Sequence, residues 1–304
     1  MELKKESFTI KKGLDIQLEG EAVRNLKTHL SSKSYIFPTD FRWFVPKLLV
    51  KEGDPVTVGT PLFCKKRDER VCVVSPVNGK ITQIVRGEKR VLEVIEIENE
   101  ATSIPKKCEI PENLSSSIIQ SLMLQNGLWP MLRQRPFSVI PSPDKKPKSL
   151  FISCFDSSPL APDFFFLLNN QKEMWQKGVE ILKLLLGEIP IYLGLNSNDN
   201  NSIFEETKDV NIRYFSGPHP AGNVGTQIHL VDPINKGESV WFIHPQDVVT
   251  IGRFFLKGEL SFDRIVALTG PELTETGYWK VNYGSDLKSL LMPLLHSDNV
   301  RLIS

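Results

Sequence analysis

The stretch VKEGDPVTVGTPLFCKKRDERVCVVSPVNGKITQI, residues 50–84, decides the fold of the first part of the chain. Turn signals at Gly53-Asp54, Gly59 and Asn78-Gly79 separate its short apolar runs. Runs of this length, with apolar and polar residues alternating, are typical of β-strands that bury one face. The stretch therefore predicts an all-β module.

The glycine spacing defines this module more closely. The pattern V-x-x-G-D-x-V-x-x-G-x-x-L, followed by S-P-x-x-G-x-I, resembles biotinyl- and lipoyl-carrier domains, where glycine permits the tight turns of a flattened barrel. A carrier needs a lysine at the tip of its central hairpin. Counting from Leu62 places Arg67 and Asp68 at the tip, with Lys65 and Lys66 two positions early. We therefore interpret the module as structural.

Composition limits the size and the partners of the protein. With 304 residues, of which 40% are hydrophobic, the chain can form two or three domains with their own cores. Its 37 basic and 36 acidic residues leave a net charge of +1, so no overall field would gather nucleic acid or an anionic membrane surface.

The cysteines and the apolar stretches add two exclusions. Cys64, Cys72, Cys108 and Cys154 form no C-x-x-C pair and no signal peptide precedes them, which indicates reduced thiols in a cytoplasm and neither a zinc nor an iron-sulfur site. The most apolar stretches fall short of the ~20 residues that cross a bilayer, so we expect membrane association only through partner subunits.

After a polar linker at residues 101–111, strands and helices alternate. We expect strands at 149–154, 189–195, 212–215, 240–243 and 264–268, and helices at 162–187, after the glycine-rich turn 216–226, and at 245–258. This alternation predicts a Rossmann-like domain with a mainly parallel sheet and helices on both faces. Met174 and Trp175 lie on an apolar helical stripe and are expected in the core.

The last forty residues change rhythm again. RIVALTG and GYWKVNYG read as strands, SDLKSLLMPLL reads as a helix, and the chain ends on an apparent strand, Val300–Ser304. Because a natural domain seldom ends on an unpaired edge, we expect a truncated chain.

Three segments together resemble the A subunits of the bacterial sodium-translocating NADH:quinone oxidoreductases. They are IKKGLD (10–15), GLWPMLRQRPFS (127–138) and GPHPAGNVGT (217–226), with RGEKRVL (86–92) between them. The resemblance implies an α/β multidomain chain. Its parts would be an N-terminal segment (1–30), a biotinyl/lipoyl-like barrel-sandwich hybrid (31–100), the Rossmann-like domain (101–260) and a partial β-grasp, SLBB-like domain (261–304).

The same family is similar in fold to the flavin- and NADH-binding subunit of complex I and to the C subunit of the Rnf complex. In those relatives, a glycine-rich loop lets backbone amides approach the flavin. Here the corresponding segment, Leu128–Ser138, is filled by large side chains. The relatives also have an acidic turn beside the nucleotide, and Asp156 is the one carboxylate of that turn that remains in this chain. The resemblance therefore implies no flavin, iron-sulfur centre or metal in this chain.

The large side chains of segment 128–138 suggest a quinone site. A quinone offers two carbonyl acceptors and a flat ring, which suits arginine donors beside aromatic faces. The candidates are Trp129, Arg133, Arg135, Pro136 and Phe137, with Phe41, Trp43 and Phe44 as a second aromatic cluster beside Arg42. In the alternative interpretation, the arginines tie the loop to nearby carbonyls and the aromatic residues belong to the core.

The loop 216–226 has two interpretations as well. Gly217, Gly222 and Gly225 could present backbone N–H groups to an anion, with His219 rigidly held between two prolines. The favoured alternative is a sharp turn, because the P-loop and G-x-G-x-x-G patterns are absent. His229 and His244 each stand alone in an apolar setting and are expected to be packed. No metal-ligand spacing or nucleophile motif appears, so no catalytic residue is predicted.

The resemblance implies a soluble subunit of a sodium-pumping respiratory NADH:ubiquinone reductase. It would contribute to ubiquinone binding on the cytoplasmic face of the bacterial inner membrane, held there by subunits B to F, and the isolated chain would be inactive. The alternative is a docking subunit with a degenerate flavin and NADH site and no ligand. A free-standing carrier enzyme is disfavoured by the hairpin count.

Overall fold

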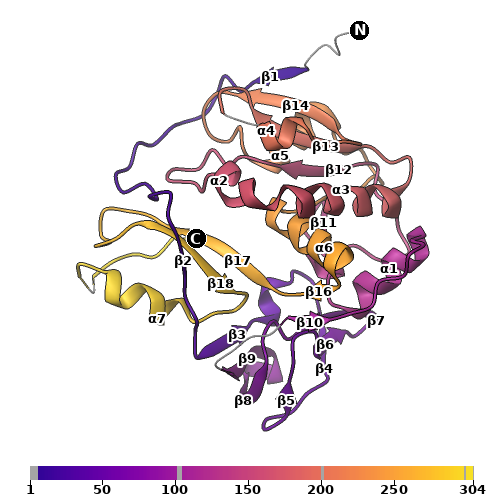
Figure 1. The fold of residues 1–304 in the computed structure, drawn as a ribbon, viewed down its shortest axis with the longest axis vertical. Helices are drawn as coiled ribbons and strands as arrows, with labels where there is room; N and C mark the ends of the chain where they lie inside the picture. The colour runs from indigo at the N-terminus through magenta and orange to yellow at the C-terminus, as the bar shows by residue number, and fades with distance from the viewer. Residues whose placement is uncertain (1–5, 101–104, 200–201, 298, 304) are drawn as a thin grey trace.

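A β-sandwich, an α/β domain and a small third sheet make up the computed structural model, which describes residues 6–100, 105–199, 202–297 and 299–303. Figure 1 shows the α/β sheet at the top, the β-sandwich at the bottom and the third sheet at the left.

The β-sandwich consists of two sheets that share one apolar core. Their strand orders are β3-β9-β8-β5 and β4-β6-β7. The strands are β3 (Lys33–Ile36), β4 (Pro46–Leu48), β5 (Pro55–Val56), β6 (Pro61–Lys65), β7 (Asp68–Val74), β8 (Gly79–Arg86) and β9 (Leu92–Asn99), with 3-10 turns at Pro38–Asp40 and Glu88–Arg90. Gly53 and Gly59 have positive φ at the predicted turns, and the all-β prediction is confirmed.

The central hairpin differs from the sequence count. Lys65 pairs with Asp68, so Lys66 and Arg67 form the exposed two-residue turn, and the placement of Asp68 at the tip was wrong. The turn comes one residue earlier than counted, and β7 then takes up residues 69–71 as a bulge between the pairs that Asp68 and Cys72 make with β6. Lys66 therefore stands at the tip. The argument against a carrier role, that the tip has no lysine, no longer holds.

The α/β domain has the strand order β1-β14-β13-β12-β15-β11, parallel except for β11. Its strands are β1 (Ser7–Thr9), β11 (Arg133–Arg135), β12 (Leu150–Ser153), β13 (Ile191–Asn196), β14 (Asn211–Ser216) and β15 (Val240–Phe242). Successive residues of β12 pack on opposite sides: Leu150 belongs to the large core, whereas Phe151 contacts Ile228 of α5. Helices therefore cover both faces, as predicted.

The helices lie close to their predicted positions. They are α1 (Ser116–Gln125), α2 (Phe164–Leu168), α3 (Lys172–Leu186), α4 (Ser202–Glu205), α5 (Val224–Val231) and α6 (Pro245–Lys257), with 3-10 turns at Trp129–Met131 and Asn169–Gln171. The single helix expected over 162–187 is divided, because the polar Asn169–Gln171 turn separates α2 from α3. Trp175 is buried and donates to Thr207 Oγ1 at 2.8 Å, which confirms its place in the core.

The third sheet contains one strand from the first thirty residues and two strands from the last forty-five. β17 (Asp263–Leu268) pairs with β18 (Gly277–Asn282), and β2 (Leu26–Thr28) joins β18 in parallel. α7 (Leu287–Leu291) and a 3-10 turn at Met292–Leu294 follow, and β10 (Lys106–Lys107) pairs with β16 (Glu259–Leu260). The strand expected at the end is wrong for residues 300–303, which have no neighbouring strand to pair with among the described residues; Ser304 lies outside them.

Two glycines let α3 and α6 cross closely. A Cβ at Gly252 would lie 1.7 Å from the carbonyl oxygen of Met174, and one at Gly178 would lie 2.1 Å from that of Val248. Such contacts with backbone atoms cannot be relieved by rotating a side chain, so the helices would have to separate.

We expect Gly252→Ala to lower the free energy of unfolding by about 1–3 kcal/mol, although alanine is the better helix former. Gly225→Ala in α5 is the matched control, since a Cβ there meets open space and should stabilise the chain by up to about 1 kcal/mol. Thermal unfolding of both variants measures the difference. Equal midpoints would contradict the close crossing.

Candidate functional site

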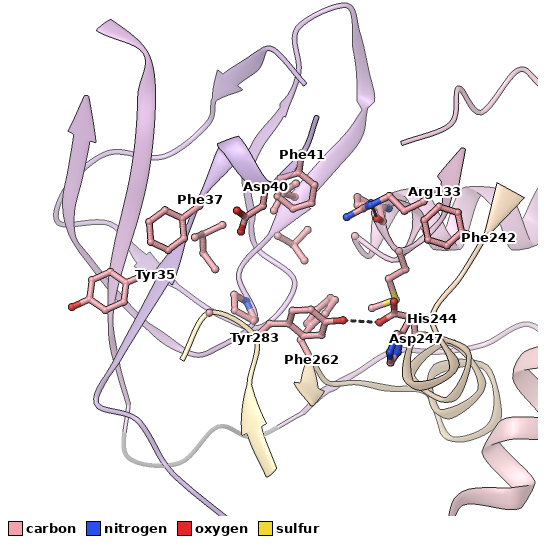
Figure 2. A pocket seen from close by; sticks show the side chains of 18 residues that line it. Tyr35, Phe37, Asp40, Phe41, Arg133, Phe242, His244, Asp247, Phe262 and Tyr283 are labelled. Atoms are coloured by element: carbon pink, nitrogen blue, oxygen red, sulfur yellow. Dashed lines mark hydrogen bonds between the residues drawn. The ribbon is translucent and has the colours of Figure 1, made fainter. Parts of the chain in front are cut away.

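A cavity of about 370 Å³ lies where the three parts of the chain meet (Figure 2). The β-sandwich contributes Phe37, Asp40, Phe41, Val73 and Val74; the α/β domain contributes Met131, Arg133, Phe242, His244 and Asp247; and the third sheet and its flanks contribute Phe262 and Tyr283. The β-sandwich side is thus apolar apart from Asp40, and the α/β side carries most of the charged and hydrogen-bonding groups.

Three polar side chains form a connected cluster on one side of this cavity. The Tyr283 hydroxyl donates to Asp247 Oδ1 at 2.6 Å, and Arg264 Nη1 donates to the same oxygen and to the hydroxyl, each at 2.6 Å. Burial raises the pKa of Tyr283, and the Asp247 carboxylate raises it further, so the phenol stays protonated. The cluster joins the first turn of α6 to β17 and to the turn after β18.

His244 precedes α6 and lines the cavity beside this cluster. Its Nδ1 accepts a hydrogen bond from Gln246 N at 3.2 Å and caps the helix. Burial, reinforced by the charge of Arg264, lowers the pKa of His244 to about 4. The imidazole is therefore neutral near pH 7, and because Nδ1 is the acceptor, the proton is on Nε2.

Arg133 supplies the cationic group on the cavity wall. Its Nη1 donates to the carbonyl oxygens of Pro130 and Leu132, and its guanidinium lies 5.5 Å from the centre of the Phe41 ring. Burial lowers its pKa, and within the described residues no carboxylate lies within ion-pair distance of it. A largely enclosed guanidinium with spare donors can bind an acceptor on a ligand.

Asp40 carries the second carboxylate of the lining. Partial burial raises its pKa, and the charge of Arg133 opposes this shift. It comes from the 3-10 turn at Pro38–Asp40, and Figure 2 shows its carboxyl group on the side of the cavity opposite His244.

The structure separates the residues of the predicted quinone segment. Arg133 lines the cavity, but Trp129 is buried in the core, where its Nε1 donates to Pro141 O at 2.9 Å. Arg135 lies outside the lining and stacks 5.0 Å from the Phe242 ring centre, with its buried Nε lacking a hydrogen-bond partner. Pro136 and Phe137 are exposed.

The second aromatic cluster is divided in the same way. Phe41 lines the cavity, whereas Phe44 is buried against Phe63 in the β-sandwich. Trp43 and Phe137 contact each other at the surface with ring centroids 4.7 Å apart, and both have positive φ, a conformation that aromatic residues rarely adopt. These two residues join the β-sandwich to the α/β domain outside the cavity.

The glycines of the loop 216–226 allow close contact with the rest of the chain. A Cβ at Gly217 would lie 2.1 Å from Ile10 O, and one at Gly222 would lie 2.4 Å from Ser157 N. His219 Nδ1 and Ser157 Oγ are 3.1 Å apart, and that oxygen also accepts from Gly222 N at 2.8 Å. These contacts favour the interpretation of the loop as a turn.

Sequence reasoning missed several cavity residues. His244 was expected only as a packed residue; it is partly buried and hydrogen-bonded, but it also lines the cavity. The expectation for His229 was wrong, because it lies on the exposed face of α5. The position of His244 and Asp247 in the sequence was the signal that could have identified them. Both follow the carboxyl end of β15, and parallel sheets bind their ligands at the carboxyl ends of the strands.

Two further properties concern the described residues alone. No helix in that part of the chain is long and apolar enough to cross a membrane. Nor does it contain a group of three or more His, Cys, Asp or Glu residues that could hold a metal ion.

The fold and the cavity define a two-domain class, a barrel-sandwich hybrid joined to an α/β domain. Residues 8–100 match the family model of the NqrA N-terminal barrel-sandwich hybrid domain, and residues 114–260 match that of the NqrA second alpha/beta domain. The chain therefore belongs to the NqrA family, the A subunits of Na(+)-translocating NADH-quinone reductases.

Curated relatives agree over nearly the whole chain. The A subunit of the Na(+)-translocating NADH-quinone reductase from Haemophilus influenzae is 34% identical over 302 residues, which cover 98% of this chain and 67% of the relative. The corresponding Yersinia pseudotuberculosis protein is 36% identical, over 97% of this chain and 67% of the relative. A solved chain of an NAD+-reducing NiFe-hydrogenase, air-oxidized, is similar at a TM-score of 0.42 and 12% identity, over 60% of this chain and 39% of that one.

The neutral state of His244 predicts a loss of stability in weak acid. The unfolded imidazole titrates near pH 6.5, so the stability contributed by the neutral ring is complete above that pH and is lost as the pH falls towards 4. Between pH 7 and pH 5 we expect His244 to account for a loss of about 2 kcal/mol.

The control is His244→Asn, which keeps an acceptor for Gln246 N but cannot titrate. Denaturant unfolding at both pH values should show a smaller loss for this variant than for the wild type. Identical losses would mean that the pKa of His244 is not depressed.

Proposed function

We propose that this chain works as a subunit of a sodium-translocating NADH:quinone reductase and holds the quinone head group in the cavity between its three parts. The observation that carries the proposal is the pairing of a largely enclosed guanidinium, Arg133, with aromatic and apolar walls in a cavity of about 370 Å³. Volumes of this order are ordinary for small-molecule sites.

The chemistry of the lining suits a quinone. Each quinone carbonyl accepts hydrogen bonds, and the cavity offers the guanidinium of Arg133 and the Nε2–H of His244 as donors. The ring would lie against Phe41 and Phe242, which come from opposite sides of the cavity. Asp247 and Tyr283 already satisfy each other, so they would hold the wall in place without competing for the ligand.

We assign NADH oxidation to another subunit. Protein side chains cannot accept hydride, so a flavin or an equivalent group must do so. The packing supports this assignment, because Val74 lies directly against Gly127. A Cβ added at Gly127 would lie 2.4 Å from a methyl group of Val74. The β-sandwich therefore occupies the side of Gly127 on which a cofactor would need open backbone.

The remaining parts of the proposal concern assembly. The named relatives are subunits of a Na(+)-translocating reductase, and by analogy we place this chain among partner subunits B to F on the cytoplasmic face of the bacterial inner membrane. Ubiquinone is the expected substrate, and the isolated chain is expected to bind it without reducing it.

Replacing Arg133 tests the binding role. Arg133→Met removes a charge-assisted donor worth about 1.5–3 kcal/mol, which should weaken the binding of a short-chain ubiquinone about ten- to a hundredfold. Arg135→Met is the matched control on the same strand, since Arg135 lies outside the lining and touches the site only through Phe242, and it should lower the affinity much less than Arg133→Met does. Calorimetric titration measures both, with NADH as a ligand that should give no binding heat.

Two outcomes would contradict the proposal. If the wild-type chain binds no short-chain ubiquinone, the alternative function, a docking subunit without a ligand, is favoured. If Arg135→Met weakens binding and Arg133→Met does not, the quinone lies along the outer side of β11.

A further inference from the structure

Two of the four cysteines face each other across a hairpin. Cys64 on β6 and Cys72 on β7 are direct partners in the antiparallel register, so their side chains project from the same face of the sheet. The other two stand apart: Cys108 donates to Asn126 Oδ1, and Cys154 is buried after β12.

The geometry of this pair is compatible with a disulfide. Directly opposed residues in an antiparallel sheet have Cα atoms about 4.5–5.5 Å apart, within the range of about 4.4–6.8 Å that disulfides require. The two thiol groups lie close enough to influence each other's pKa. No large backbone movement would be needed to join them.

The two cysteines differ in solvent exposure, and this difference determines which of them reacts first with an oxidant. Cys64 is 1% exposed, whereas Cys72 is partly exposed and stands at the end of the bulge formed by residues 69–71. The Cys72 thiol donates to Glu69 O at 3.4 Å across this bulge. An external oxidant therefore reaches Cys72 first, and Cys64, its partner on the neighbouring strand, can react next.

We propose that Cys64 and Cys72 form a reversible modification site, a dithiol that a small-molecule disulfide such as glutathione disulfide converts into a cross-strand disulfide. The Cys72 thiolate attacks one sulfur of the oxidant, forms a mixed disulfide and releases one thiolate. The Cys64 thiolate then attacks the Cys72 sulfur of the mixed disulfide and releases the second. Two protons and two electrons leave the protein, and one disulfide is reduced to two thiols.

The surroundings set the rate of this exchange. Burial raises the pKa of Cys64, and burial raises the pKa of Cys72 to about 11. The charged groups that face the pair are Lys47 of β4 and Glu69 of β7, which form an ion pair with each other at 2.6 Å. Oxidation should therefore be slow at pH 7 and accelerate about tenfold per pH unit up to pH 9, as the thiolate fraction rises.

The pair is also connected to the cavity. Val73 and Val74, which follow Cys72 directly in β7, form part of the apolar wall. Joining β6 to β7 at this point fixes the strand on which that wall is built. The proposed disulfide does not depend on a quinone occupying the cavity.

The test uses the whole chain, incubated with glutathione disulfide at pH 8, alkylated and measured by intact mass. The wild type should lose two alkylatable thiols without gaining a glutathione adduct, and peptide mapping should join Cys64 to Cys72. Cys64→Ser should instead accumulate one glutathione adduct at Cys72. Cys72→Ser should keep Cys64 free, because Cys64 is covered. Dithiothreitol should restore the wild-type thiols.

Two results would overturn the proposal. One is a wild-type chain that retains all its thiols at pH 8 and pH 9 while Cys64→Ser takes up glutathione at Cys72. The other is a wild-type chain that stops at a Cys72 adduct. Either would show that Cys64 cannot reach Cys72.

Discussion

The buried carboxylate of Asp247 is the constraint on which the arrangement of the three parts depends. A carboxylate in this position is stable only if hydrogen bonds and an opposite charge replace the water it has lost. Arg264 and Tyr283 supply both, and each comes from a different place on the third sheet. Gln246, the preceding residue, completes the contact by pairing its side-chain amide with the backbone of Ile265. These bonds fix the third sheet against α6, and the cavity is the space that this docking leaves beside the β-sandwich.

The local periodicity of the sequence was enough to predict most of the fold. Glycine turns and alternating residues predicted the β-sandwich, and the strands around Phe151 and Leu193 were recognisable because parallel strands are apolar on both faces. The pairing of the N-terminal segment was not predictable in the same way. β1 and β2 are each three residues long and obtain their partners from β14 and β18, more than two hundred residues away. Such short strands have no periodicity of their own.

The candidate site was predicted only in part, since a cavity depends on how separate elements meet. Arg133 and Phe41 were proposed from composition and both line it, but neighbours with the same composition, such as Trp129 and Phe44, turned out to be core residues. Residue type could not distinguish them, because the direction of each side chain is set by the local backbone: Arg133 lies on β11, whereas Trp129 lies in the 3-10 turn before it. Tyr283 gave no signal at all, for its role arises from a hydrogen bond to a residue 36 positions away.

Photoaffinity labelling with an azido-ubiquinone tests the central claim, that the cavity between the three parts holds the quinone head group, most directly. If the head group lies there, label removed by competing ubiquinone will be found in peptides covering residues 35–41, 127–133 and 242–247, which meet at the cavity. Competable label confined to the loop 216–226, or to the exposed pair Trp43 and Phe137, would contradict the claim.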